Sequence, residues 1–175
     1  MALDATWVRD HIRPIADYPQ PGVTFRDITP LLGDAAAFGR AVDDLVTGFH
    51  DVEVSRVVGI ESRGFILAAP VAYRLRAGFV PVRKAGKLPW AVAREEYELE
   101  YGSDKLEIHR DAIHPDEPIL IVDDVLATGG TAEATAKLVE ALGGRVVGIG
   151  VMIELEALGG RAKLANHRVE SLTRY

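Results

Sequence analysis

One segment of the sequence has the residue types of a phosphate-binding loop. Residues 119–134 read ILIVDDVLATGGTAEA, in which an apolar run is followed by two aspartates, a turn of small residues and a helical pattern. Backbone N–H groups at the start of a helix can converge on a phosphate, and the helix dipole favours its negative charge. Glycine permits close approach of the backbone, and threonine hydroxyls add donors. We therefore expect a cradle for one phosphate group, made of Ala127, Thr128, Gly129, Gly130 and Thr131.

Two acidic residues, Asp123 and Asp124, come just before this cradle. Their carboxylates could accept hydrogen bonds from the neighbouring hydroxyls of a ribose, or they could engage a hydrated magnesium ion. They could equally cap the next turn of the chain, which is a purely structural role. The segment lacks the lysine of the common ATP-binding loop and the three-glycine spacing of dinucleotide-binding proteins, so it supports neither class. The arrangement suits a ribose 5-phosphate.

Short apolar runs alternate with helical patterns along most of the chain. Runs that are apolar on both faces are typical of buried parallel strands. Their β-α-β order predicts an α/β fold, in which helices flank a parallel twisted sheet. Ligands of such sheets bind at the carboxyl ends of the strands, where the cradle lies. The expected strands cover residues 56–60, 78–82, 118–122 and 145–155, and the expected helices cover residues 35–50, 64–76 and 130–142.

The N-terminal part does not follow this alternation. The spacing of its apolar residues predicts a short helix within residues 3–13, which ends before Pro14. Residues 14–34 contain four prolines and show no clear period, so we expect an ordered loop packed by its aromatic residues. Asp34 is placed to cap the helix that follows this loop.

A second exception lies between the strands expected at 78–82 and 118–122. The sequences YELEYG and KLEIH both alternate between polar and apolar residues, and a short Gly-Ser-Asp turn separates them. Alternation of period two on either side of a short turn predicts an antiparallel hairpin. We expect this hairpin to form a flap within the segment of about residues 84–109.

The composition limits the class of protein. The chain has 175 residues, of which 48% are hydrophobic and 26% charged, a profile typical of a single soluble globular domain. A net charge of -6 without blocks of like charge argues against binding to nucleic acid. The absence of cysteine excludes disulfides and fits a reducing compartment. The sequence has no signal-peptide pattern and no apolar stretch of the roughly 18 residues that cross a membrane, so we expect a cytoplasmic protein.

The cradle also carries a family resemblance. VDDVLATGGT at residues 122–131 resembles the motif with which type I phosphoribosyltransferases bind 5-phosphoribosyl 1-pyrophosphate (PRPP). The resemblance implies the fold of that family: a parallel sheet flanked by helices, with a small N-terminal hood, here about residues 1–34, and a hairpin flap. Relatives that act on hypoxanthine and guanine typically carry an aspartate at the position of Ala127. Four further segments, PGVTFRDITPLL, ESRGF, RKAGKLPW and ELEYG, resemble the adenine-specific branch in order and spacing.

This branch implies a purine salvage enzyme that converts adenine and PRPP to AMP and pyrophosphate. We expect Mg²⁺ as the cofactor, bound through substrate oxygens and water with no direct protein ligand. The family is generally dimeric, so the resemblance implies a homodimer. Two rival readings are transfer to another base, such as xanthine or orotate, and a regulatory protein that keeps this fold and binds nucleic acid.

Two segments are predicted to bind pyrophosphate. The ESRG segment lies between a strand and a helix, and the family uses this loop for pyrophosphate; we assign Arg63 a catalytic role as well. A cationic cluster beside Gly86 could neutralise the leaving group, could reach the site of a neighbouring subunit, or could be an ordinary solvated loop. The predicted pyrophosphate-binding residues are Glu61, Ser62, Arg63, Gly64, Arg83, Lys84 and Lys87.

The purine base is predicted to bind near the N-terminus. Phe25 could stack on the ring while backbone groups from Val23 to Arg26 bond to its edge, or Phe25 could anchor the long loop in the core. The resemblance assigns Glu100 to proton transfer at a ring nitrogen of adenine and Tyr101 to shielding the ribose from water. Alternation alone would make Glu100 an ordinary solvent-facing residue.

Overall fold

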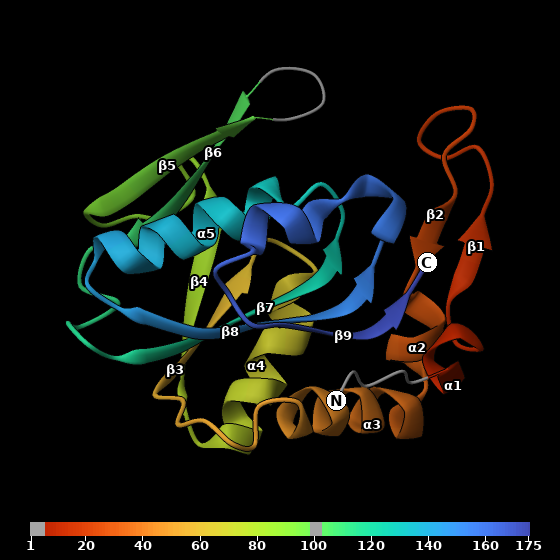
Figure 1. The fold of residues 1–175 in the computed structure, drawn as a ribbon, viewed down its shortest axis with the longest axis horizontal. Helices are drawn as coiled ribbons and strands as arrows, with labels where there is room; N and C mark the ends of the chain where they lie inside the picture. The colour runs from red at the N-terminus through yellow and green to blue at the C-terminus, as the bar shows by residue number, and fades with distance from the viewer. Residues whose placement is uncertain (1–5, 99–102) are drawn as a thin grey trace.

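The structure is a computed structural model that describes residues 6–98 and 103–175 (Figure 1). Its central sheet contains β3 (Arg56–Ile60), β4 (Gly78–Lys84), β5 (Val92–Glu98), β6 (Ser103–His109), β7 (Pro118–Leu126), β8 (Arg145–Glu154) and β9 (Val169–Arg174). The seven strands are ordered β5-β6-β4-β3-β7-β8-β9. The five neighbouring strands β4, β3, β7, β8 and β9 are parallel. β6 pairs antiparallel with β4 and with β5. The parallel sheet and the hairpin predicted from the sequence are confirmed.

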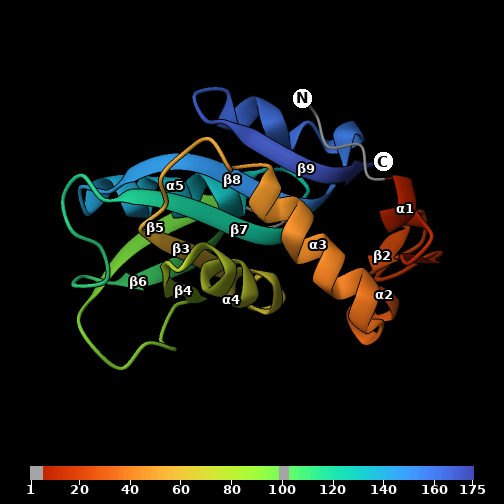
Figure 2. The same cartoon turned by 90° about the horizontal axis from the view of Figure 1, so that it is seen from below.

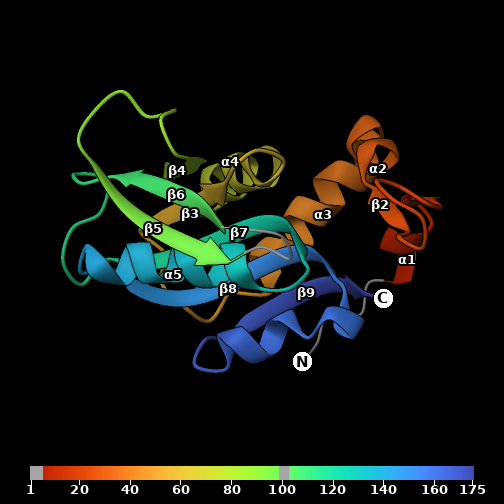
Figure 3. The ribbon, with the colours of Figure 1, turned by 90° about the horizontal axis from the view of Figure 1, so that it is seen from above.

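Helices cover both faces of this sheet. The first long helix, α3 (Ala35–Thr47), and the second, α4 (Gly64–Leu75), lie on one face, and α5 (Gly130–Ala141) lies on the other (Figures 2 and 3). The 3-10 turns η1 (Glu156–Leu158) and η2 (Gly160–Leu164) share the face of α5. All three long helices match the expected ranges within a few residues, which confirms the predicted arrangement of a parallel sheet flanked by helices.

The N-terminal segment contains more secondary structure than the sequence predicted. The expected loop over residues 14–34 is wrong, because two short strands pair antiparallel there and a helix follows them. The helix expected within residues 3–13 is a single turn among the described residues. Strands of three residues, interrupted by prolines, carry too little periodicity to be recognised locally. These elements are α1 (Thr6–Arg9), β1 (Arg13–Ile15), β2 (Phe25–Asp27) and α2 (Thr29–Gly33).

Asp34 begins α3 as predicted. Its carboxylate accepts hydrogen bonds from the backbone N–H groups of Ala36 and Ala37, each at 2.9 Å. These bonds satisfy two of the donors that the first turn of a helix leaves free. They also lower the pKa of Asp34, because they stabilise the charged carboxylate.

Apolar clusters fill the space on each side of the sheet. The cluster under α3 includes Phe49, which is 1% exposed and follows the end of that helix. Its ring packs against Gly148 and Gly150 of β8, where a Cβ on Gly150 would lie 3.0 Å from a ring carbon. The two glycines therefore make room for the aromatic ring, and this contact fixes α3 to the sheet.

Phe49→Ala is expected to lower the free energy of unfolding by about 3–5 kcal/mol, because a large buried side chain is removed and the rigid strand beneath it cannot fill the cavity. Urea unfolding followed by circular dichroism measures the change. The matched control is Tyr73→Ala, whose side chain is 83% exposed and whose loss is expected to cost within about 0.5 kcal/mol. Equal losses in the two variants would contradict this view of the core.

The parallel strands bring distant loops to one edge of the sheet. Because β3, β4, β7 and β8 are parallel neighbours or near neighbours, the segments that follow Ile60, Lys84, Leu126 and Glu154 all leave at the same edge. Three of these segments contain residues selected from the sequence as site candidates. Across residues 6–98 and 103–175, no helix has the length and apolar character needed to cross a membrane.

Candidate active site

The segment after β7 has the form of an anion-binding cradle. α5 begins at Gly130, and Gly129 directly before it adopts a left-handed backbone with φ of 81°. The helix therefore directs its free N–H groups and the positive end of its dipole towards this segment. A small hollow adjoins it. The lining residues are Asp123, Val125, Leu126, Ala127, Thr128, Gly129, Thr131, Ala132 and Val151.

The turn at Gly159 and Gly160 supports this cradle from the side of β8. A Cβ on Gly160 would overlap the carbonyl oxygen of Ala127 and would lie 2.8 Å from the nitrogen of Gly129. In the same way, a Cβ on Gly129 would overlap the carbonyl oxygen of Gly160. The only signal for this contact in the sequence is a pair of consecutive glycines after a strand, which does not by itself indicate what the pair contacts.

The two aspartates lie inside β7, which extends four residues beyond the expected strand at 118–122. Asp123 Oδ1 accepts a hydrogen bond from the N–H of Asp124 at 2.9 Å. Removal from solvent raises the pKa of Asp123 well above its usual value, and the negative charge of Asp124 raises this pKa further. A proton, a ribose hydroxyl or a cation would relieve this accumulation of charge.

The loop between β3 and α4 meets these aspartates. Arg63 Nε lies 2.8 Å from Asp124 Oδ2, and Asp124 is only 6% exposed. Gly64 packs so closely that a Cβ there would lie 2.6 Å from Asp123 Oδ1. The peptide bond between Glu61 and Ser62 is cis. Two segments that are about sixty residues apart in the sequence therefore form one site.

Phe25 lies beside the same arginine. The Arg63 guanidinium carbon is 5.1 Å from the centroid of the Phe25 ring, and the Tyr18 ring meets Phe25 edge to face with centroids 5.3 Å apart. Phe25 is half-buried and belongs to neither of the buried apolar clusters. The structure thus favours a ring at the border of the site over an anchor of the core.

The expected contacts of Val23 and Arg26 with the base involve their backbone groups, and the structure shows the following neighbours for these two residues. The guanidinium carbon of Arg26 lies 3.9 Å from the centroid of the Tyr175 ring, near the C-terminus. The N–H of Val23 donates to the carbonyl of Gln20 at 3.2 Å, and the Val23 carbonyl accepts from the N–H of Tyr18 at 3.1 Å. Of the three predicted residues, Phe25 is the one whose side chain contacts Arg63.

Glu61 organises the cationic cluster predicted after β4. One of its carboxylate oxygens accepts from Arg83 Nε at 3.3 Å and from the N–H of Lys84 at 2.9 Å, and the other pairs with Lys87. Burial raises the pKa of Glu61, but the hydrogen bonds and charges of these partners outweigh it and lower the pKa overall. The cluster is therefore an ordered structure on a buried carboxylate, and sequence reasoning missed this function of Glu61.

A second buried carboxylate fastens the same loop to the hairpin. Glu107 of β6 accepts from the N–H of Gly86 at 2.9 Å and from Arg94 Nε at 2.8 Å. Lys84 Nζ lies 3.0 Å from Asp104 Oδ2, also on β6, and this contact raises the pKa of Lys84. The hairpin and the cationic loop therefore form one unit.

The hairpin approaches the cradle through Tyr97. Tyr97 lines a hollow together with Gly130 at the start of α5. Burial raises the pKa of Tyr97, and the charge of Asp104 adds to this effect. β5 and β6 pair from Val92 with His109 to Glu98 with Ser103. The predicted residues Glu100 and Tyr101 lie outside the described residues.

The sequence is similar to known phosphoribosyltransferases. The chain matches the phosphoribosyl transferase domain family over residues 32–171. It is 51% identical over 167 residues to the adenine phosphoribosyltransferase of Symbiobacterium thermophilum, an alignment that covers 95% of this chain and 98% of that protein.

Solved structures agree. The adenine phosphoribosyltransferase of Thermoanaerobacter pseudethanolicus has a TM-score of 0.95 and 48% identity, covering 98% of this chain and 99% of that one. The enzyme of Saccharomyces cerevisiae, complexed with adenine and an imino-altritol bisphosphate, has a TM-score of 0.91 and 39% identity, covering 96% and 97%. With the cradle, the paired aspartates and Arg63 assembled at one edge of the sheet, the chain belongs to the adenine phosphoribosyltransferase family.

Proposed function

We propose that this chain transfers the 5-phosphoribosyl group of PRPP to adenine and releases AMP and pyrophosphate, a reaction of purine salvage. One observation carries the proposal: the phosphate cradle, the two aspartates and Arg63 meet at the carboxyl edge of the sheet. The yeast relative, whose structure holds adenine together with a sugar-like bisphosphate, supports the same pair of ligands.

In this proposal, the cradle binds the 5-phosphate through the backbone N–H groups of Ala127 to Thr131 and the hydroxyls of Thr128 and Thr131. Asp123 and Asp124 accept hydrogen bonds from the ribose hydroxyls, which fixes the sugar. Asp124 Oδ2 is buried and has no hydrogen bond of good geometry with any residue that the structure describes, although Arg63 Nε is 2.8 Å away. An additional donor supplied by the substrate would satisfy this oxygen.

Pyrophosphate leaves towards the loop after β3 and the cationic cluster. Arg63 contacts Asp124 through Nε, which leaves its terminal Nη groups for the phosphates, together with backbone groups of Ser62 and Gly64. Arg83, Lys84 and Lys87 neutralise the negative charge that develops as the bond to the ribose breaks. Glu61 holds these cations in place and has no direct contact with pyrophosphate in this scheme.

Magnesium is the proposed cofactor. Within the described part of the chain, no group of three or more His, Asp or Glu side chains is placed to hold a metal ion. The buried Asp124 Oδ2 and the raised pKa of Asp123 suit a hydrated cation that reaches the site with its substrate. Bound to the oxygens of PRPP, Mg²⁺ would supply charge neutralisation for the leaving group.

Adenine attacks the anomeric carbon as pyrophosphate leaves with the electron pair of the broken C–O bond. Phe25 stacks on the base beside Arg63. Glu100 transfers a proton to or from a ring nitrogen of adenine, as general acid or base. Tyr101 shields the anomeric carbon of the ribose from water. These two assignments rest on the family resemblance of the segment ELEYG.

Three broader features belong to the same proposal. The segment of about residues 1–34 acts as a hood over the base, and the hairpin within about residues 84–109 acts as a flap over the ribose. Two copies of the chain form a homodimer, in which Arg83 and Lys84 could serve the neighbouring site. The enzyme works in the cytoplasm, which the absence of cysteine supports.

Incubation with Mg²⁺, PRPP and one base at a time tests the function. With adenine, hypoxanthine, guanine, xanthine and orotate offered separately, we expect rapid formation of AMP from adenine alone, followed with pyrophosphate by chromatography. Omission of Mg²⁺ is expected to stop the reaction. Glu100→Gln is expected to lower kcat and leave the KM for PRPP unchanged, because it removes only the proton transfer.

Other outcomes have distinct meanings. Turnover of a different base would keep the fold and the PRPP site but refute the assignment to adenine. No turnover with any base would refute the enzymatic function and favour a regulatory protein, which titration with PRPP and with DNA would then examine.

A further inference from the structure

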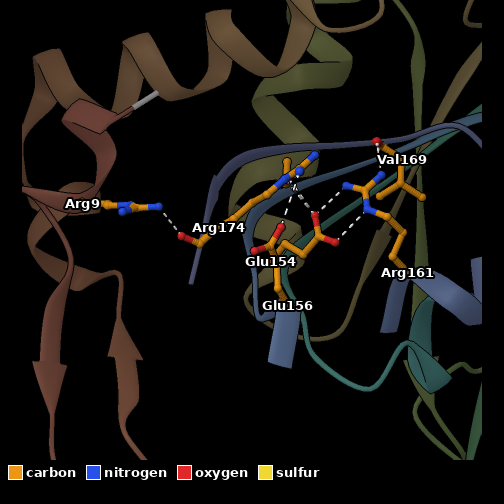
Figure 4. A network of polar contacts seen from close by, with 7 residues as sticks. Arg9, Glu154, Glu156, Arg161, Val169 and Arg174 are labelled. Atoms are coloured by element: carbon orange, nitrogen blue, oxygen red, sulfur yellow. Dashed lines mark hydrogen bonds and ion pairs between the residues drawn. The ribbon is translucent and has the colours of Figure 1, made fainter. Parts of the chain in front are cut away.

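A polar network lies at the end of β8, next to the cradle but outside it (Figure 4). Its centre is Glu154, which is 4% exposed and pairs in register with Leu126 at the end of β7. Ser171 Oγ donates to Glu154 Oε2 at 2.9 Å, and Arg174 Nε lies 3.4 Å from the same oxygen. The carboxylate is thus held by β9 on one side.

Arg161 of η2 holds the other side. Its Nε donates to Glu154 Oε1 at 2.7 Å and its Nη2 donates to Oε2 at 2.5 Å, a bidentate pair. Its Nη1 donates to the carbonyl of Val169 at 2.9 Å. The hydrogen bonds from Arg161 lower the pKa of Glu154 and so keep the carboxylate charged. Figure 4 shows the guanidinium pointing at both partners.

The position of Arg161 in the chain connects this network to the cradle. The residue before it is Gly160, whose backbone packs against Ala127 and Gly129 too closely to admit a Cβ at either glycine. Three hydrogen bonds to two strands therefore fix the peptide unit that supports the cradle. On the opposite side of Glu154, the polar side-chain contacts of Arg174 with described residues are to Glu154, Glu156 and Ser171, none of which belongs to the cradle.

We propose that Arg161, anchored on Glu154, is a positioning residue that presses Gly160 against the phosphate cradle and so sets the cradle for the 5-phosphate of PRPP. This inference rests on the proposed function, which supplies PRPP as the ligand. A positioning residue acts on the affinity for the phosphate-bearing substrate. It leaves the affinity for the base unchanged, whereas a merely structural residue would lower stability without separating the two substrates.

The test compares Arg161→Gln with Arg161→Lys and with the control Arg174→Gln. Arg161→Gln is expected to raise the KM for PRPP by about 10- to 100-fold and to leave the KM for adenine unchanged. Arg161→Lys is expected to show a smaller rise, because an ammonium keeps the charge but loses the bidentate pair and the bond to Val169. Arg174→Gln removes a contact to the same carboxylate and is expected to lower Tm with both KM values unchanged. Arg161→Lys keeps a positive charge beside the buried Glu154, so this variant guards against a loss of folding in Arg161→Gln.

A readout independent of turnover separates this inference from the proposed function. Calorimetric titration with ribose 5-phosphate measures binding to the cradle directly, and Arg161→Gln is expected to weaken it by the same factor. If the wild type makes no AMP but binds ribose 5-phosphate more tightly than Arg161→Gln does, the function fails and the positioning role stands. An unchanged KM for PRPP in Arg161→Gln, an equal rise of both KM values, or the same effect in Arg174→Gln would overturn the inference.

Discussion

Gly129→Ala is expected to lower kcat/KM for PRPP by roughly a thousandfold, the loss expected when preorganised donors around a phosphate are displaced. The φ of Gly129 is 81°, a conformation that costs a residue with a Cβ about 1–2 kcal/mol. The added Cβ would also overlap the carbonyl oxygen of Gly160, so the cradle must move away from η2. Steady-state kinetics with PRPP as the varied substrate measures the effect.

The matched control is Gly143→Ala. Gly143 has a similar φ of 87°, follows α5 at its far end, and would place a Cβ no closer than 3.4 Å to Pro115. A similar loss of stability, with kinetics like those of the wild type, is therefore expected for this variant. If the two variants have equal kcat/KM values for PRPP, backbone strain alone explains the result and the contact with Gly160 has no role.

Asp123→Asn is expected to lower kcat/KM for PRPP by about 100-fold. At pH values above neutral it is also expected to raise Tm, so activity and stability change in opposite directions. The loss of activity follows from the replacement of a carboxyl oxygen that accepts from the ribose hydroxyls by an amide NH₂ group, which can only donate. The gain in stability follows from the raised pKa of Asp123, because a carboxylate that is costly to ionise in the folded protein destabilises the folded state. Thermal unfolding without ligand measures the second effect.

The pH dependence of that gain has a definite sign. Below the unfolded value of about 3.8, Asp123 is protonated in both states, and Asn is expected to give no advantage. As pH rises towards the elevated folded pKa, the folded wild type loses stability, and the advantage of Asn grows until it is complete above that pKa.

Asp27→Asn is the contrasting control. Hydrogen bonds from the backbone and then the side chain of Thr29 lower the pKa of Asp27, so its loss should reduce Tm at neutral pH. A fall in Tm for Asp123→Asn at pH 8 would refute the argument.

The sequence by itself determined the elements whose residues are contiguous. The cradle, the aspartates before it, the parallel strands and the cap at Asp34 each depend on a local pattern of apolar, small or acidic residues. Such patterns reflect hydrogen bonding and burial within a few residues, so they need no knowledge of the tertiary fold. The antiparallel hairpin could be predicted for the same reason, because its two strands alternate between polar and apolar residues on either side of a short turn.

Short or irregular elements could not be found in this way. β1 and β2 are stabilised by pairing with each other across an intervening loop, and β9 carries polar residues at Glu170, Ser171 and Thr173 that conceal its strand character. Each owes its conformation to partners far away in the sequence. Local propensity is a weak guide where tertiary contacts decide.

Only the tertiary structure decided which side chains cooperate. It paired Arg63 with Asp124, gave Glu61 the cationic cluster, turned Arg26 towards Tyr175 and set Gly160 against Gly129. Each contact joins segments that meet because parallel strands end at the same edge of the sheet or because β2 packs against Tyr175. Charge and hydrogen-bond complementarity over such separations depends on three-dimensional distance, which the order of residues does not encode locally.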